Sequence, residues 1–200
     1  MTGIKLVLVG GTSHVGKSTL SQRLAGELGW NYLSTDQLAR HPGRPWKVGD
    51  RDVPDDVVEH YASLSVAELV DSVLEHYRSN VWPIVDAIVH SRLNNPFDLG
   101  LVLEGSAILP EQVAEADYPR LRAVWLTAPD QLIRERIRQN SDYEQGTLTE
   151  RRLIDTFIKR SVAIDGGLKD SVERHGQRIL DASSADVFDV LRQLSAGELS

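Results

Sequence analysis

The sequence contains no cysteine, which excludes disulfide bonds, thiolate metal sites and cysteine nucleophiles. It also lacks a basic excess: 22 Lys and Arg stand against 29 Asp and Glu, giving a net charge of −7. Proteins that bind nucleic acids or anionic membranes broadly carry such an excess, so we expect neither partner. No apolar run approaches the length of a membrane span, and there is no internal repeat or low-complexity linker.

The N-terminal residues lack a basic region followed by a signal-type apolar segment, because the apolar run Ile4–Val9 leads directly into a glycine-rich loop. We therefore expect no secretory signal, and the absence of cysteine suits a cytoplasmic location. With 200 residues, of which 41% are hydrophobic and 26% charged, the chain is expected to form a single domain over residues 1–200. A monomer or a homodimer is expected.

The glycine-rich loop has the spacing Gly, four residues, Gly-Lys-Ser. It reads Gly11-Thr12-Ser13-His14-Val15-Gly16-Lys17-Ser18. Ile4–Val9 before it is apolar and β-branched, as in a strand buried on both faces. Thr19–Leu28 after it has apolar residues at helical spacing and ends at Gly29. The order strand, loop, helix predicts a phosphate-binding loop; the alternative is a glycine turn that only joins two elements.

Each residue type in the loop suits a bound polyphosphate. Main-chain N–H groups of the loop and the helix N-terminus can point together at phosphate oxygens, and Gly11 and Gly16 leave room for that approach. Lys17 can reach the β- and γ-phosphates, while the Ser18 hydroxyl can bind Mg²⁺. We assign no role to the His14 side chain. The predicted cofactor-binding residues are Gly11, Thr12, Ser13, His14, Val15, Gly16, Lys17, Ser18 and Thr19.

An aspartate follows the second predicted strand, Trp30–Leu33, at the end of Ser34-Thr35-Asp36. Ligand-contacting residues of doubly wound sheets collect at the carboxyl ends of strands. Asp36 is therefore a candidate catalytic and substrate-binding residue, which accepts or orients the proton of a hydroxyl that attacks the γ-phosphate. The alternative is that its carboxylate caps a helix starting at Gln37.

A loop over residues 41–54 is rich in proline, glycine and positive charge. Arg40 and Arg44 are candidates for contact with an anionic substrate, together with Lys47. The alternative is a solvated loop in which only Trp46 packs onto the core.

Helices are predicted from Asp55 to Asn94. A capping box of Ser65 and Glu68 starts the second of them, and a bend is expected at Pro83. Residues 41–95 would then form a helical insertion between the second and third strands, acting as a substrate-binding part of the domain.

The third predicted strand, Leu99–Leu103, ends in Glu104-Gly105-Ser106. An acidic residue here in a phosphate-loop protein usually approaches the Mg²⁺ shell, often through water, so Glu104 is a candidate outer metal residue. Gly105 allows the main chain to approach a ligand, and both residues are candidates for substrate contact. The alternative is an ordinary strand-to-helix turn. A surface helix is expected from Pro110 to Asp117.

The fourth strand, Arg122–Thr127, leads into a helix that carries three arginines. Arg134 and Arg138 are four residues apart and therefore share a helix face. Guanidinium groups that converge on a transferred phosphate stabilise the charge on its oxygens, so these two are candidate catalytic residues. The alternative is surface arginines paired with Glu135 or Glu144.

The last part of the chain is predicted as a long helix over 150–175, broken or weakened at Gly166-Gly167, then a strand over 178–180 and a helix over 185–194. The pattern leaves open whether Lys159 and Arg160 face the site. The turn after the last strand is expected near the nucleotide base.

With these motifs in this order, the chain resembles the small phosphate-loop kinases of the adenylate-kinase-like group, which includes shikimate and gluconate kinases and chloramphenicol phosphotransferase. It is most similar to 2-phosphoglycerate-kinase-like proteins at the loop, at Thr35-Asp36 and at Leu103-Glu104-Gly105 followed by Pro110. The resemblance implies a three-layer α/β/α fold around a parallel sheet of about five strands, with a mobile lid at about 134–150. It also implies ATP and Mg²⁺ as cofactors, Asp36 beside the acceptor hydroxyl, and Arg134 or Arg138 as lid arginines.

We therefore predict an ATP- and Mg²⁺-dependent kinase that transfers the γ-phosphate to a hydroxyl or phosphate of a small molecule. One alternative is a nucleotide-binding switch or ATPase that acts through a protein partner. The absence of an Asn-Lys-x-Asp motif and of an apolar strand ending in Asp-Glu argues against it. The other alternative, a nucleoside or nucleotide kinase, differs only in the acceptor pocket.

Overall fold

The computed structural model describes residues 3–39, 43–49, 51–95, 99–116, 118–184, 186 and 188–191. Its centre is a parallel sheet in the order β2-β3-β1-β4-β5. β1, β3 and most of β4 are buried, as their continuous apolar runs predict for a sheet covered on both faces. The prediction of five parallel strands is confirmed. The strands are β1 (Leu6–Gly11), β2 (Asn31–Ser34), β3 (Leu101–Glu104), β4 (Leu121–Thr127) and β5 (Ile179–Asp181).

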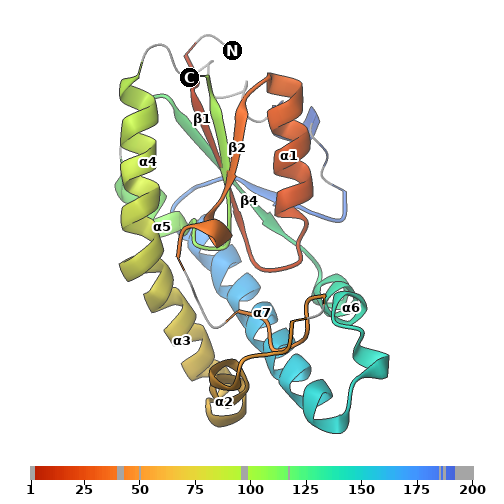
Figure 1. Ribbon diagram of the computed structural model, residues 1–200. Helices are drawn as coiled ribbons and strands as arrows, with labels where there is room; N and C mark the ends of the chain where they lie inside the picture. Colours follow the sequence, from red (N-terminus) through yellow and green to blue (C-terminus); the bar gives the residue numbers. More distant parts are fainter. Residues whose placement is uncertain are drawn as a thin grey trace.

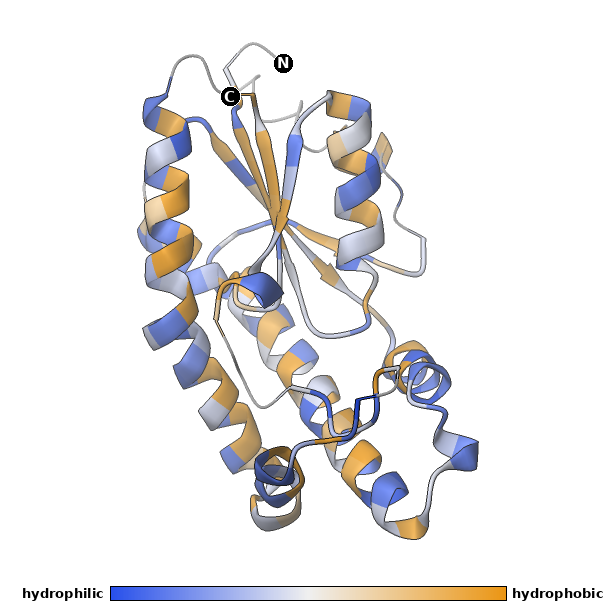
Figure 2. Ribbon diagram, viewed as in Figure 1, coloured by the Kyte–Doolittle hydropathy of each residue, from blue (hydrophilic) through white to orange (hydrophobic). Residues whose placement is uncertain are grey.

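Helices cover both faces of this sheet, which gives the predicted three layers (Figure 1). One face packs against α1 (Lys17–Leu28) and α6 (Asp130–Asn140), and the other against α4 (Trp82–Asn94) and α5 (Pro110–Glu115). Apolar residues concentrate on the strands and on the helix sides turned toward them (Figure 2). Buried side chains of the first face include Val9, Leu24, Val124, Leu126, Ile133 and Ile137, and those of the second include Leu8, Val85, Val89, Leu103 and Trp125.

The helical insertion between β2 and β3 contains α2 (Asp55–Ser63), α3 (Val66–His76) and α4. The predicted capping box is present: Glu68 N donates to Ser65 Oγ at 3.3 Å, and Ser65 N donates to Glu68 Oε2 at 2.8 Å. A π-helical turn, Tyr77–Val81, joins α3 to α4 just before Pro83. Proline has no N–H to donate to the preceding turn, so the chain accommodates it through a wider turn at the place where we expected a bend.

The long C-terminal helix α7 (Leu148–Arg174) runs through Gly166 and Gly167 without a break, which corrects the sequence prediction. A glycine costs a helix about 1 kcal/mol relative to alanine. Buried Leu168 and Val172 beyond the glycines offset that cost by packing on the sheet. An ion pair between Lys169 Nζ and Asp165 Oδ2 at 2.7 Å also spans them.

Two smaller predictions are also corrected. α5 ends at Glu115 and is half-buried rather than on the surface, because Pro110 and Val113 pack into the core. β5 lies one residue further along the chain than expected. Of the predicted final helix, residues 188–191 are helical, and most of the remainder lies outside the described residues.

The register of the sheet brings the ends of three strands to one edge. Glu104 at the end of β3 pairs with Val9 of β1 on one side and with Ser34 of β2 on the other. The chain leaves β1 toward β2 and later returns on the opposite side as β4, so this edge has the crevice in which doubly wound sheets bind ligands. Within the described ranges, no helix combines the length and apolar character needed to cross a bilayer.

Candidate active site

The loop between β1 and α1 has the backbone that its glycines permit. Gly16 has φ of 98°, in the left-handed region that favours glycine, and α1 begins at the next residue. A Cβ added to Gly11 would lie 2.5 Å from the carbonyl oxygen of Leu126. The loop is tied to α7, because the Thr12 hydroxyl donates to Ser161 O at 3.2 Å. These contacts fix a tight loop at the carboxyl end of β1.

Lys17 places its ammonium group inside the loop with little exposure to solvent. Its Nζ donates to Thr12 O at 2.7 Å and to Ser106 Oγ at 3.2 Å. Burial lowers the pKa of Lys17, while the negative charges of Glu104 and Asp36 act in the opposite direction. Because burial removes water from this ammonium group, an anion that enters the loop would stabilise its charge.

Glu104 accepts hydrogen bonds from two elements that flank it. Ser18 Oγ donates to Glu104 Oε1 at 3.0 Å, and the Tyr32 hydroxyl donates to the same oxygen at 2.9 Å. Burial and the charge of Glu104 raise the pKa of Tyr32, so its hydroxyl stays a donor. The structure thus brings together both predicted metal residues and adds Tyr32, which the sequence analysis missed. Strand alternation alone does not show that Tyr32 faces Glu104.

A cavity of about 580 Å³ lies over the loop. Its lining contains every predicted loop residue from Ser13 to Thr19, together with Asp36, Arg44 and Glu104. Arg23, Ser106, Arg136 and Ala182 also line it, and sequence analysis had assigned no role there to the first three. Ala182 follows β5, where the turn was expected near the nucleotide base.

A second cavity of about 600 Å³ adjoins the first. The two share Ser13, Asp36, Arg44 and Ser106. The second cavity is otherwise lined mainly by the helical insertion and α7, including Trp46, Tyr77, Phe157 and Arg160. Burial raises the pKa of Tyr77, as does Asp36, against the opposing effects of Arg160 and a hydrogen bond with Ser106. The shared residues mark the place where the two cavities meet.

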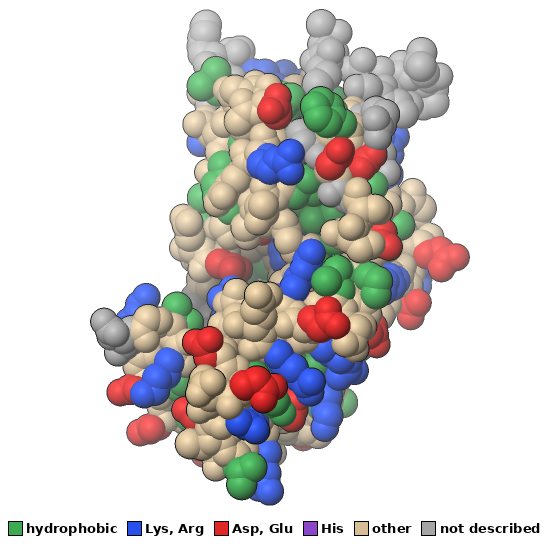
Figure 3. Space-filling model, turned by 90° about the vertical axis from the view of Figure 1, so that its right-hand side faces the viewer, with side chains coloured by type: hydrophobic (Ala, Val, Ile, Leu, Met, Phe, Trp, Pro, Cys, Tyr) green, Lys and Arg blue, Asp and Glu red, His purple; other side chains and the backbone are tan. Residues whose placement is uncertain are grey.

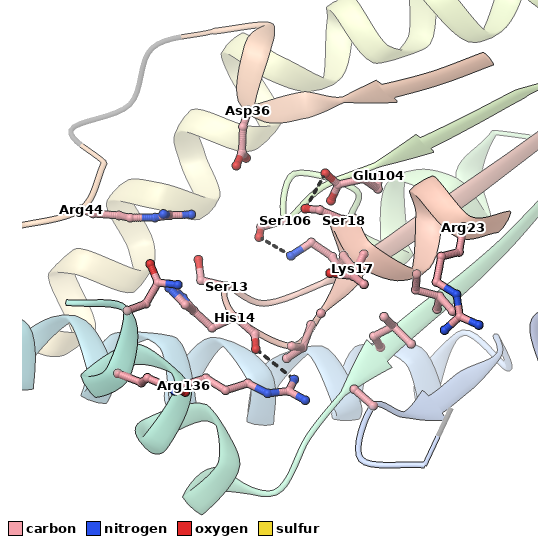
Figure 4. Close-up of a pocket in the computed structure, with 18 residues that line it drawn as sticks. Ser13, His14, Lys17, Ser18, Arg23, Asp36, Arg44, Glu104, Ser106 and Arg136 are labelled. Atoms are coloured by element: carbon pink, nitrogen blue, oxygen red, sulfur yellow. Dashed lines mark hydrogen bonds between the residues drawn. The ribbon is translucent and has the colours of Figure 1, made fainter. Parts of the chain in front are cut away.

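Asp36 lies at this junction. It belongs to a short 3₁₀ turn, Thr35–Gln37, whose N-cap is Ser34: Asp36 N donates to Ser34 Oγ at 3.4 Å. The capping alternative for the Asp36 carboxylate therefore does not apply. Figure 4 shows this carboxylate pointing into the cavity toward Ser106 and Lys17.

Gly105 serves a different purpose from the predicted one. It lines neither cavity. A Cβ added to it would overlap the side chain of Thr35. The close approach that this glycine permits is therefore to Thr35, beside Asp36, rather than to a ligand.

The arginines of α6 are arranged differently from the sequence expectation. Arg136 lines the first cavity and donates from Nη1 to His14 O at 3.2 Å. Arg134 and Arg138 line neither cavity. Arg138 pairs with Asp155 at 3.4 Å and lies 4.7 Å from the centre of the Tyr143 ring. On the face that carries α6 and the start of α7, Lys and Arg side chains gather among acidic ones (Figure 3).

The remaining basic candidates lie in different surroundings. Arg40 lies outside the described residues. Lys159 is exposed, whereas Arg160 is 4% exposed and lines the second cavity. Arg160 donates to the Tyr61 hydroxyl, and its guanidinium lies 4.4 Å from the centre of the Phe157 ring. Its Nε is buried without a hydrogen-bond partner among the described residues.

These features define the class to which the architecture belongs: a three-layer α/β/α phosphate-loop kinase fold. A gluconokinase from Sinorhizobium meliloti 1021 shares it with a TM-score of 0.54, over 98% of this chain and 93% of that chain, at 16% identity. A shikimate kinase from Aquifex aeolicus is similar over 98% of this chain and 99% of that chain, with a TM-score of 0.50 and 14% identity. No protein-family model matches the sequence, and no curated protein matches it either. At these identities, the likeness establishes the shared fold.

Proposed function

We propose that the protein is a kinase that transfers the γ-phosphate of ATP to a hydroxyl group of a small anionic molecule. The observation that carries this proposal is the position of Asp36, where the phosphate-loop cavity meets the second cavity. A carboxylate at this junction can reach both a phosphate held by the loop and a hydroxyl that enters from the other side.

The loop provides the nucleotide side of the reaction. Its main-chain N–H groups and the Lys17 ammonium would bind the phosphates, and Ala182 after β5 would face the base. Ser18 and Glu104 fit a magnesium ion, because a hydroxyl and a carboxylate oxygen lie 3.0 Å apart at the end of the loop. Bound Mg²⁺ would neutralise charge on the β- and γ-phosphates.

Three basic groups surround the place where phosphate would be transferred. Lys17 and Arg136 approach from the loop side, and Arg44 lines both cavities. Together they would stabilise the charge on the phosphoryl oxygens, while Asp36 accepts or orients the proton of the attacking hydroxyl. We propose Arg136 for the role that the sequence suggested for Arg134 or Arg138.

The second cavity is suited to an anionic acceptor. Arg160 is buried there with an unpartnered Nε, and Arg44 and Arg51 line the same space. A buried guanidinium gains most from a carboxylate or phosphate, which can accept from two of its N–H groups. Trp46 and Phe157 add apolar walls for the carbon skeleton. The helical insertion over 41–95 would thus serve as the acceptor-binding part of the domain.

The segment 134–150 would act as the lid over the nucleotide. It carries Arg136, and its outer turn is anchored to α7 because the Tyr143 hydroxyl donates to Asp155 Oδ2 at 2.9 Å. Such an anchor would make the lid move together with the start of α7. A cytoplasmic location and a monomeric or homodimeric state remain predictions from the sequence.

The proposal is tested with ATP labelled at the γ-phosphate. Purified protein with Mg²⁺ is offered small hydroxy acids, sugar acids, sugar phosphates and neutral sugars, and labelled products are separated. We expect a labelled product from an anionic hydroxyl compound, lost in Lys17→Ala and kept in Lys159→Ala. Steady release of labelled phosphate at a rate that no acceptor changes would instead identify an ATPase.

A further inference from the structure

His14 has a backbone conformation that is uncommon for a residue other than glycine. Its φ is 66°, and Asp142 is the only other described non-glycine residue with positive φ. A side chain in this region of φ and ψ carries a steric cost that glycine avoids. Residues held in such conformations concentrate at functional sites, so His14 invites a functional explanation.

The His14 ring packs against two aromatic residues that lie outside the phosphate loop. Its centre lies 5.9 Å from that of Trp46 and 6.1 Å from that of Phe157. The rings of Trp46 and Phe157 meet edge to face, with their centres 4.8 Å apart. Trp46 and Phe157 line the second cavity, whereas His14 lines the first. These three rings therefore form a contact between the two cavities.

This contact works through packing rather than hydrogen bonding. Both ring nitrogens of His14 are buried without a hydrogen-bond partner among the described residues. Burial lowers the pKa of His14 to about 4, and the positive charges of Arg44, Lys17 and Arg136 act in the same direction. The ring is thus a neutral aromatic group at physiological pH, and a phenyl ring could make the same contacts.

Trp46 lies on the strap, which we define as residues 43–49, and which crosses α7 between α2 and α6 (Figure 1). The guanidinium of Arg44 lies 6.0 Å from the centre of the Trp46 ring. On the other side, Arg136 holds the main chain of His14 through its carbonyl oxygen at 3.2 Å. A continuous series of contacts thus runs from Arg136 through His14 and Trp46 to Arg44.

We propose that His14 is a positioning residue that couples the two cavities: a polyphosphate in the loop shifts the His14 ring, and the ring shifts Trp46 and the strap that carries Arg44. The phosphate competes with the His14 carbonyl oxygen for Arg136, which frees the His14 main chain to turn. The proposal rests on the proposed function, because it requires a polyphosphate in the loop. Coupling between two binding sites is reciprocal. The factor by which nucleotide changes the affinity for an anion near Arg44 is therefore the factor by which that anion changes the affinity for nucleotide.

The experiment follows Trp46 directly. The protein is labelled with 5-fluorotryptophan, and its four tryptophans are followed by ¹⁹F NMR, with Trp46 assigned through Trp46→Phe. The full chain is titrated with Mg²⁺ and the β,γ-imido analogue of ATP, whose affinity is measured by calorimetry. Spectra are compared at saturation, so a change in affinity does not affect the comparison.

For the wild-type protein, we expect the Trp46 resonance to shift by several linewidths at saturation and the resonances of Trp30 and Trp82 to shift much less. His14→Phe keeps the Trp46 shift, because it keeps the ring. His14→Gly loses it, because glycine accepts the same backbone conformation without a side chain. This proposal alone is overturned if the Trp46 resonance shifts as much in His14→Gly as in the wild type. It is also overturned if calorimetry shows bound nucleotide while the wild-type Trp46 resonance does not shift. Absence of nucleotide binding in calorimetry overturns the proposed function and this proposal with it.

Discussion

The Tyr32 hydroxyl and the Ser18 hydroxyl donate to one and the same oxygen, Oε1 of Glu104, at 2.9 and 3.0 Å. Tyr32 comes from β2 and Glu104 from β3, so two neighbouring strands orient one carboxylate against the start of α1. A carboxylate held in this way keeps its position relative to the loop before any ligand arrives. Such outer partners strongly affect metal affinity in proteins.

Replacement of Tyr32 by phenylalanine should therefore raise the Mg²⁺ requirement. We expect Tyr32→Phe to increase the Mg²⁺ concentration for half-maximal binding of an ATP analogue by about tenfold, because Glu104 loses the donor that orients it. Calorimetric titration at several Mg²⁺ concentrations measures this effect. The matched control is Tyr118→Phe, which removes a hydroxyl that donates to Asp86, away from both cavities. Equal Mg²⁺ dependence in the two variants would show that Tyr32 does not act through the metal.

Arg136 and Arg138 offer a second matched pair on one helix. Arg136 lines the first cavity, whereas Arg138 pairs with Asp155. We expect Arg136→Ala to lower the rate of phosphoryl transfer by about a hundredfold or more, since a guanidinium on a transferred phosphate contributes strongly to its stabilisation. Arg138→Ala should stay within about threefold of the wild-type rate. If rapid-quench kinetics showed a larger loss of rate in Arg138→Ala than in Arg136→Ala, Arg138 would be the arginine at the phosphate, as the sequence predicted.

The stability of the protein should depend on pH through His14. Its pKa is about 4 in the folded state and 6.5 as the ordinary value, so the unfolded chain binds the proton more readily between these values. Stability is therefore greatest above pH 6.5 and falls toward pH 4, by about 3 kcal/mol for this group. His14→Phe should remove this part of the pH dependence. Urea denaturation at pH 7, 5.5 and 4.5 measures the free energy of unfolding at each pH. If that free energy changed with pH equally in the variant and the wild type, His14 would not be the group responsible.

Gly105 should tolerate no side chain while Thr35 is present, because a Cβ would overlap the threonine. We expect Gly105→Ala to destabilise the fold by about 1–3 kcal/mol, as overpacking does elsewhere. Thr35→Ala in the same chain should recover part of the loss, since it removes two of the overlapping atoms. Chemical denaturation of the two single variants and the double variant gives the interaction energy. Strictly additive effects would mean that the two residues do not meet.

Local signals explain what the sequence predicted well. The phosphate loop, the capping box of Ser65 and Glu68, and the buried strands each depend on residues close together in the chain. Their order then limits the topology, because parallel strands need crossover connections. The five strands were predictable for this reason, and the resemblance to small phosphate-loop kinases implied that they form one parallel sheet.

The placement of the α6 arginines was not predictable from periodicity. Ile133 and Ile137 form the buried stripe of this helix. Arg136 flanks the stripe on one side, and Arg134 and Arg138 flank it on the other, so the pattern does not say which flank faces the loop. Packing between elements distant in sequence decides this. The same holds for Tyr32 and Arg160, whose partners lie 72 and 99 residues away.

The proposed role of Asp36 can be measured by rapid-quench single-turnover transfer from labelled ATP to the acceptor that the screen identifies. We expect Asp36→Asn to bind the ATP analogue within about threefold of wild-type affinity but to transfer phosphate at least about a hundredfold more slowly. Asp71→Asn, on the exposed side of α3, should behave as the wild type. Transfer by Asp36→Asn at the wild-type rate would show that this carboxylate has no role in phosphoryl transfer.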